Sequence, residues 1–266
     1  MSRVQPKPVG LGVLPLLLAT MLGLTSCDDV SGPAEEVAEE PFSFDLYAAD
    51  QSRLVLEGIN GTITICGASG TDSLFIDGVR QVWAQTLEDA GAHLDDLQVE
   101  VEAVAESVVV RTIQPTGTSD RTYVVNYELV IPARLEVLVS SANGTITIES
   151  IENTVSVANA NGDITLDHIS GSAFVGLANG NVALRVTLPL DGTINISVAN
   201  GTIGLWIPSN TSAEFSAGVA NGTISTSNLV LQNSSSTATS LSGTLGAGQG
   251  EILLSVGNGQ ITVVGF

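Results

Sequence analysis

Apolar and polar residues alternate in short runs along this chain, and most of these runs begin directly after an Asn-Gly dipeptide. An apolar residue stands two positions after the glycine, and often another two positions further on. The segments SSANGTITI, GLANGNVAL and SVANGTIGL all follow this pattern. One-in-two alternation is typical of a β-strand with one buried face. The pattern therefore predicts many short strands, each starting at an Asn-Gly corner.

The corner dipeptide recurs with a nearly fixed period. It stands at Asn60-Gly61, Asn143-Gly144, Asn161-Gly162, Asn179-Gly180, Asn200-Gly201, Asn221-Gly222 and Asn258-Gly259. The five central copies are 18, 18, 21 and 21 residues apart. A period near 20 indicates a solenoid, in which each coil leans on the one below. Gly adopts positive φ without steric cost and Asn tolerates it, so the dipeptide suits a sharp corner. Stacked asparagines can also form a hydrogen-bonded ladder.

A β-hairpin is the alternative interpretation of each dipeptide, because Asn-Gly between alternating apolar residues is also the strongest short hairpin signal. Val198 and Ile203 could face each other across a two-residue turn. The constant flanks and period favour the solenoid, since a meander requires neither.

Apolar positions also repeat from coil to coil. A shift of 18 residues maps Ile146, Ile148, Ile151, Val155 and Val157 onto Ile164, Leu166, Ile169, Ala173 and Val175. Such columns form the core of a parallel β-helix. We therefore expect an all-β fold, a single-stranded parallel β-helix of right-handed sense over residues 141–266. The 37 residues from Asn221 to Asn258 are interpreted as a degenerate coil with a loop protruding at 233–250.

Residues 42–140 interrupt the repeat and predict a small mixed α/β cap at the N-terminal end. Strands are expected at 72–83, 98–113 and 123–131. A short helix is expected from Thr86 to Leu97, with Thr86 as its N-cap. Its apolar face would consist of Leu87, Ala90, Leu94 and Leu97. A cap of this kind would protect the exposed end of the stack.

The first 41 residues carry targeting information. Arg3 and Lys7 precede an uncharged apolar stretch at 9–24, and Leu24-Thr25-Ser26-Cys27 follows it. This pattern predicts a lipoprotein signal peptide at 1–26 with Cys27 acylated and anchored in a membrane. The alternatives are an ordinary signal peptide and a retained membrane helix. Residues 27–41 are acidic and nearly free of bulky side chains, so they are expected to form a disordered tether. The protein is thus expected in the bacterial cell envelope, lipid-anchored on the periplasmic or surface side of a membrane.

Charge excludes one class of partner. After removal of residues 1–26, six basic residues face 28 acidic ones, a net charge of −22. Nucleic acid is not an expected partner, because phosphate binding needs a basic surface. Cys66 is the only other cysteine, so no intramolecular disulfide is expected once Cys27 is acylated.

Candidate catalytic chemistry is sparse. The best cluster is Asp163, Asp167 and His168, with Arg185 about one coil later, and a solvated surface is the alternative. His93 lies beside Asp95 and Asp96 on the expected helix. No metal-ligand spacing and no cofactor motif is found, so no metal, cofactor or catalytic residue is predicted. Outward threonines recur at Thr62, Thr64, Thr145, Thr147, Thr165, Thr202, Thr223 and Thr262, a pattern that resembles ice-binding solenoids but is also common in exposed strands.

The order of these parts resembles the bacterial putative-adhesin family of envelope proteins. The shared features are a lipoprotein signal, a first NGTITI strand, a strand-helix-strand insert, the segment IPARLEVLVSSANGTITIES and the later coil WIPSNTSAEFSAGVANG. The resemblance covers about residues 42–266 and implies a β-helix of NG-x-I repeats without catalytic residues.

The expected function is therefore a lipid-anchored, non-enzymatic envelope protein that presents its solenoid surface for adhesion, binding or scaffolding, with a glycan or an envelope protein as the possible ligand. The alternatives are an enzyme acting on envelope polysaccharides and a purely structural or stress-related envelope protein.

Overall fold

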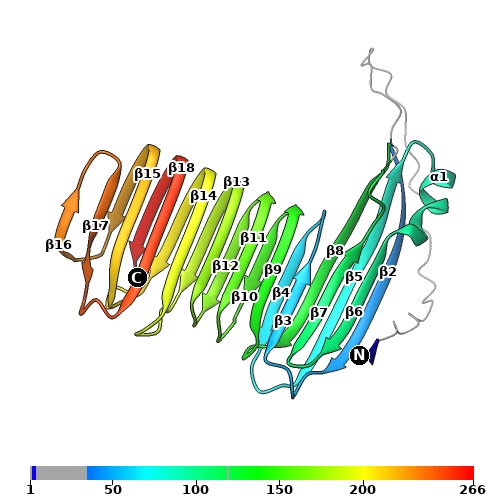
Figure 1. Ribbon diagram of the computed structural model, residues 1–266, viewed down its shortest axis with the longest axis horizontal. Helices are drawn as coiled ribbons and strands as arrows, with labels where there is room; N and C mark the ends of the chain where they lie inside the picture. The colour runs from blue at the N-terminus through cyan, green and yellow to red at the C-terminus, as the bar shows by residue number, and fades with distance from the viewer. Residues whose placement is uncertain (1, 4–34, 119) are drawn as a thin grey trace, which may run out of the picture.

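The computed structural model describes residues 2–3, 35–118 and 120–266, which fold into an elongated stack of β-strands (Figure 1). The predicted all-β fold is confirmed, with a nearly closed, solenoid-like sheet. Cys27 and the predicted signal peptide, apart from residues 2–3, lie outside the described residues.

The elements follow one another along the chain as strands with one short helical segment. They are β1 (Ser2–Arg3), β2 (Glu36–Tyr47), β3 (Arg53–Glu57), β4 (Ile63–Ala68), β5 (Ser73–Ala84), α1 (Leu87–Ala92), the 3-10 turn η1 (Leu94–Asp96), β6 (Gln98–Val104), β7 (Ser107–Ile113), β8 (Thr122–Pro132), β9 (Glu136–Asn143), β10 (Ile146–Glu149), β11 (Val155–Asn161), β12 (Ile164–Ile169), β13 (Ala173–Val186), β14 (Thr193–Ile207), β15 (Ala213–Ser227), β16 (Leu231–Ser236), β17 (Ser240–Leu245) and β18 (Gly250–Gly265).

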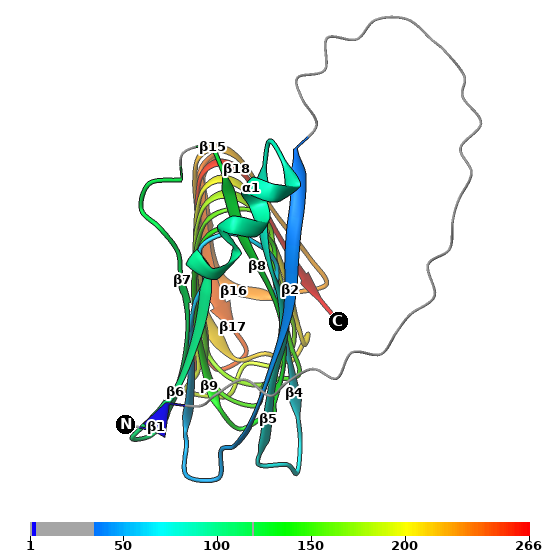
Figure 2. The same ribbon diagram turned by 90° about the vertical axis from the view of Figure 1, so that its right-hand side faces the viewer.

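Each coil contributes one strand before the Asn-Gly corner and one after it, and the two strands lie in opposite walls of the stack (Figure 2). We call these the first wall and the second wall. Strands β9 and β11 pair in parallel in the first wall, and β10 and β12 pair in parallel in the second. In β13, β14, β15 and β18 a single long strand runs through the corner.

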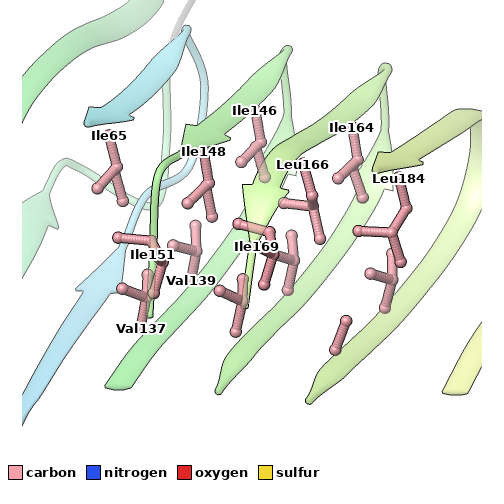
Figure 3. Close-up of a cluster of buried hydrophobic side chains, with 14 of the residues drawn as sticks. Ile65, Val137, Val139, Ile146, Ile148, Ile151, Ile164, Leu166, Ile169 and Leu184 are labelled. Atoms are coloured by element: carbon pink, nitrogen blue, oxygen red, sulfur yellow. The ribbon is translucent and has the colours of Figure 1, made fainter. Parts of the chain in front are cut away.

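The core lies between the two walls and consists of apolar columns (Figure 3). Ile146 pairs with Ile164 and Ile148 with Leu166 in the second wall. Val155 and Val157 continue along the first wall through Ala173 and Val175. All five pairs of positions related by 18 residues are buried. These columns stabilise the parallel pairing, because β-branched residues pack well on the buried face of a strand.

The coils do not stack in sequence order at the two ends. In the first wall β3 pairs with both β7 and β9, and in the second wall β4 pairs with both β8 and β10. The first coil therefore lies between two coils that come later in the chain. At the other end β18 pairs in parallel with β14 and with β15, so it separates two coils that are consecutive in sequence. Figure 1 shows both insertions.

The segment between Asn221 and Asn258 corrects one expectation. It is not a degenerate coil with a protruding loop, because β16 and β17 form an antiparallel hairpin that continues the first wall beyond β15. Only β18 has the coil geometry. Serine and threonine dominate the hairpin, so its apolar pattern is too weak to show this pairing in the sequence.

The N-terminal region also differs in detail from expectation. Residues 98–113 form two antiparallel strands, β6 and β7, that turn at Ala105 with φ 49°, rather than one strand. The helix ends at Ala92, and the Thr86 hydroxyl accepts a hydrogen bond from the Asp89 amide at 3.2 Å. Ala90 and Leu97 are buried as expected, whereas Leu87 is 58% exposed. Figure 2 shows α1 at the N-terminal end of the stack.

Two expected boundaries move. Residues 36–41, assigned from sequence to the acidic tether, form the first half of β2 and pair with β5. Their carboxylates are spaced so that backbone pairing is satisfied while the charges stay in water. The expected boundary between residues 140 and 141 falls inside β9, because the solenoid coils begin as early as β3.

Candidate functional site

The seven corner asparagines lie in one line along the stack. Each side-chain Nδ2 donates to the Oδ1 of its neighbour at 2.8–3.0 Å, in the spatial order Asn60, Asn143, Asn161, Asn179, Asn200, Asn258 and Asn221. Asn60 ends the line by donating to the Tyr123 carbonyl oxygen at 3.0 Å. All donors thus point towards the N-terminal end of the stack. Asn258 precedes Asn221 in this line because β18 lies between β14 and β15.

The corner glycines are required for two reasons. Their φ angles lie between 119° and 151°, a range that other residues rarely adopt. A Cβ added to Gly201 would also lie 1.7 Å from the Gly180 carbonyl oxygen, and one added to Gly222 would lie 1.6 Å from that of Gly259. The sequence indicates the first reason through the dipeptide. The second depends on the close approach of neighbouring coils, which no local pattern reveals.

Asn159 is a corner residue that the sequence analysis missed. It occupies a core column, next to Leu177 and Ser141 in the neighbouring coils, and is 5% exposed. Its Nδ2 donates to the Gly144 and Asn161 carbonyl oxygens at 2.9 and 3.1 Å, which ties two corners together. The repeat does not show this role, because the matching positions carry Ser141 and Leu177 and not asparagine.

The outer side of the second wall carries small polar residues in regular rows. One row runs Thr64, Thr147, Thr165, Ala183, Gly204, Thr262 and Ser225 across neighbouring strands. Successive members are one strand spacing apart, about 4.8 Å. Ala183 and Gly204 interrupt the row, as the sequence indicates, and leave its middle without a large side chain.

The candidate catalytic cluster does not assemble. Asp163 accepts hydrogen bonds from the backbone and side-chain nitrogens of Asn181 at 2.8 and 3.0 Å. The Oδ2 of Asp167 lies 2.9 Å from the Nδ1 of His168. Four residues of extended strand, about 13 Å, separate Asp163 from Asp167. The two carboxylates therefore cannot act on one bond.

Arg185 lies closer to Asp167 than to Asp163. Its guanidinium stacks over the Phe266 ring, 4.1 Å from the centroid. Asp167 and Arg185 both line a hollow of about 230 Å³ on the outer side of the second wall, together with Glu149, Thr165, Ala183 and Trp206. The sequence analysis missed Trp206. We call this hollow the Trp206 hollow.

A larger hollow of about 660 Å³ lies near the N-terminal end of the same wall. Acidic side chains line it, with Asp77 directly opposite Glu128 on neighbouring strands and Asp45 nearby. The described residues contain no group of three or more His, Cys, Asp or Glu side chains placed to hold a metal ion. Cys66 is exposed and free.

Electrostatic interactions near α1 are structural in character. Arg121 donates two hydrogen bonds to Asp89, at 2.9 and 2.7 Å, and holds the pKa of that carboxyl below its usual value. His93 lies 2.8 Å from Asp96 and 3.7 Å from Asp89. Burial raises the pKa of the Tyr127 hydroxyl, which shares a 2.7 Å hydrogen bond with Thr112.

Within the described ranges, no helix has the length and apolar character needed to span a bilayer.

Solved structures resemble this fold at low sequence identity. A putative cell adhesion protein from Clostridium sporogenes is 12% identical, with a TM-score of 0.50 over 88% of this chain and 100% of its own. Putative adhesins from Bacteroides fragilis and Parabacteroides distasonis are 10% and 7% identical, with TM-scores of 0.28 and 0.30, each over 87% of this chain and 98% of its own. At these identities the likeness concerns the fold alone.

No curated protein matches the sequence. One family matches residues 92–264, which is more than half of the chain and includes every corner dipeptide except the first. The chain therefore belongs to the Toastrack DUF4097 family.

Proposed function

We propose that this protein is a lipid-anchored, non-enzymatic component of the bacterial cell envelope that presents its solenoid surface for adhesion, binding or scaffolding. The observation that carries this proposal is the outer side of the second wall. Hydroxyl and amide groups recur there on a rigid lattice, with about 4.8 Å between coils. A lattice of weak hydrogen-bonding groups suits a repetitive ligand, because many small contacts add up along its length.

The non-enzymatic part of the proposal is supported by the site geometry. The Asp163 carboxylate accepts hydrogen bonds from Asn181, and the Asp167 carboxylate contacts His168. Catalysis of glycan cleavage needs two carboxyl groups facing one bond. The alternative of a polysaccharide-active enzyme gains no observation in its favour from the described residues.

The envelope location and the anchor rest on the sequence. Cys27 would carry the acyl chains that bind the membrane, and residues 27–34 would separate the folded stack from the lipid surface. A glycan or an envelope protein remains the proposed ligand, and nucleic acid is not an expected partner because the chain is strongly acidic. For the fold, the right-handed sense of the coils and the capping role of the N-terminal elements remain part of this proposal.

The anchor is tested by metabolic labelling with an alkyne fatty acid. The wild-type protein should be labelled and should sediment with membranes, whereas Cys27→Ala should be unlabelled and soluble. Cys66→Ala is the matched control, because Cys66 is the exposed cysteine of the described chain and should not affect labelling. Equal labelling of wild type and Cys27→Ala would exclude the lipid anchor.

The binding role is tested with the full-length protein on arrays of envelope glycans and envelope proteins. A variant with Thr147→Arg places a long cation in the outer row of the second wall and should weaken binding. Ser156→Arg makes the same change on the first wall and should have no effect. Binding that is insensitive to Thr147→Arg, or cleavage of an array glycan, would count against the proposed function.

A further inference from the structure

The Trp206 hollow spans four neighbouring coils on the outer side of the second wall. Its residues come from β10, β12, β13 and β14. The threonine row changes at this point to Ala183, which lines the hollow, and to Gly204, against which the Trp206 ring lies. The other positions of the row carry threonine or serine. The hollow is therefore a local departure from the repeat rather than a property of the solenoid.

Trp206 forms one side of the hollow, and its ring orientation is fixed by Gly204. A Cβ added to Gly204 would lie 2.8 Å from Cη2 of the indole, so the ring lies against the Gly204 backbone. The side chain is still 36% exposed. One face of the ring is thus supported by the sheet while part of it stays open to solvent. Such a ring is a preorganised apolar platform.

Arg185 is unusual among the arginines of residues 35–266. The other five form ion pairs with carboxylates: Arg53, Arg80, Arg111, Arg121 and Arg134. Arg185 has no ion pair in the described chain and is held instead over the Phe266 ring. In a protein with a net charge of −20, a guanidinium left available for hydrogen bonding beside an aromatic platform indicates a ligand contact.

We propose that the Trp206 hollow binds a neutral pyranose ring of an oligosaccharide, an inference that rests on the proposed function and specifies its ligand. The flat C–H face of a sugar packs against an indole, while its hydroxyls both donate and accept hydrogen bonds. Glu149 and Asp167 supply acceptors and Arg185 supplies donors. A sugar ring is about as long as one coil spacing, about 4.8 Å, so an extended β-1,4-linked chain can lie along the wall.

The charge balance argues against two other ligand classes. An organic cation could stack on Trp206 and approach the two carboxylates, but Arg185 would repel it. An anionic sugar could pair with Arg185, but Glu149, Asp167 and the acidic charge of the whole chain would repel it. A neutral sugar uses all three charged groups as hydrogen-bonding partners without repulsion.

The test uses the full-length protein in a polyoxyethylene detergent, which has no sugar head group. The chain has two tryptophans, Trp83 and Trp206, so Trp83→Phe leaves Trp206 as the only indole fluorophore. Titration of this variant with cellotetraose should change its emission in a saturable way. By calorimetry, Trp206→Ala in the otherwise wild-type chain should lower the affinity about tenfold or more.

A second variant separates loss of the site from loss of the fold. Gly204→Thr restores the threonine row and displaces the indole, so it should abolish binding. The melting temperature should stay near that of wild type, because threonine already occupies the same row at Thr147, Thr165 and Thr262. Arg185→Gln should also weaken binding, whereas Ser156→Arg, on the first wall and away from the hollow, should not change the affinity for cellotetraose.

The outcomes distinguish this inference from the proposed function. Binding of cellotetraose that survives Trp206→Ala and Gly204→Thr would overturn the inference, as would tighter binding of choline or of a glucuronate oligosaccharide. Absence of any oligosaccharide binding would overturn it as well. If array binding were still weakened by Thr147→Arg in that case, the proposed function would stand without the Trp206 hollow.

Discussion

The central coils and the two ends of the stack are built from the same repeat but joined differently. Between β9 and β14, coils that are consecutive in sequence are also neighbours in the stack. At each end a coil from elsewhere in the chain is inserted, β3 and β4 at one end and β18 at the other. The repeat pattern alone fixes the coil shape, while the order of coils depends on how the ends are closed.

The insertions place the coils β3–β4 and β18 within the stack and leave strands without the repeat pattern at its two ends. Both β3–β4 and β18 have parallel partners on either side, so none of their backbone groups is left at an edge. The outer positions are filled differently at the two ends. Strand β2 carries Glu36, Glu39, Glu40 and Pro41, which discourage pairing with another chain. At the other end, serine and threonine fill β16, β17 and the second half of β15.

Deletion of one coil should separate the two regions most strongly. Removal of residues 161–178 joins Ala160 to Asn179 and keeps the register of the central coils. The shortened protein should stay folded and be shorter by one strand spacing, about 4.8 Å. Removal of residues 200–220 should cause loss of the C-terminal end, because it joins strands that lie on opposite sides of β18. Circular dichroism and gel filtration measure both outcomes, and equal tolerance of the two deletions would refute the insertion of β18.

Glycine substitutions at the corners come next in size. Gly201→Ala combines strained φ with a backbone clash, and should cost about 2–4 kcal/mol of unfolding free energy. Gly222→Ala meets the same clash, but β15 has no further neighbour beyond its corner and can shift, so about 1 kcal/mol is expected. Gly176→Ala is the control, since an added Cβ there has no atom within 4 Å. Urea unfolding gives the three values, and equal costs at Gly201 and Gly222 would contradict a more adaptable end.

Substitutions in the asparagine ladder should also cost more unfolding free energy in the central coils than at the C-terminal end, but by a smaller amount. Asn179 both donates and accepts within the ladder, so Asn179→Ala removes two hydrogen bonds and should cost about 1–2 kcal/mol. Asn221 is the last member and only donates, so Asn221→Ala should cost about 0.5–1 kcal/mol. Thermal or urea unfolding of both variants measures the ratio. A larger loss at Asn221 would show that the ladder is not the source of the effect.

The smallest expected effect concerns acid. The Asp89 carboxyl has a lowered pKa because Arg121 binds its charged form, so its stabilising contribution is fully present above the ordinary value of 3.8. It is lost as the pH falls through the lowered pKa. The difference in urea midpoint between wild type and Asp89→Asn should therefore be constant from neutral pH to about pH 4 and shrink below it. A difference that does not change with pH would exclude the Arg121 interaction as its cause.

The coil and its corner could be predicted from sequence because both depend on local chemistry. The positions of Asn143 and Gly144 in the repeat specify a bend, and the apolar columns specify which face is buried. The same reasoning extended the helix to Leu97, because Leu94 and Leu97 continue the apolar spacing past its end at Ala92. It also placed Leu87 on the buried face, whereas the structure leaves Leu87 exposed. Periodicity shows which positions can be buried, but the depth of burial depends on neighbouring elements.

The order of coils and the Trp206 hollow could not be predicted. Every corner carries the same frame, so the sequence does not specify whether Asn258 follows Asn221 or precedes it in the stack. The hollow needs Ala183 of one coil to lie beside Trp206 of the next, where Gly204 leaves room for the indole. The interruption of the threonine row was visible, but its combination with an aromatic ring arises only when the coils are aligned.

The position of β18 also constrains when this protein can finish folding. During synthesis β15 and the β16–β17 hairpin emerge before β18, yet β18 must come to lie between β14 and β15. The C-terminal end therefore cannot fold coil by coil during synthesis, as the central coils can. It must wait for β18, or open again to admit it. A polypeptide that ends before residue 250 would leave β14 and β15 without their shared partner strand. Their unpaired backbone groups could then bind a quality-control protease or pair with a neighbouring chain.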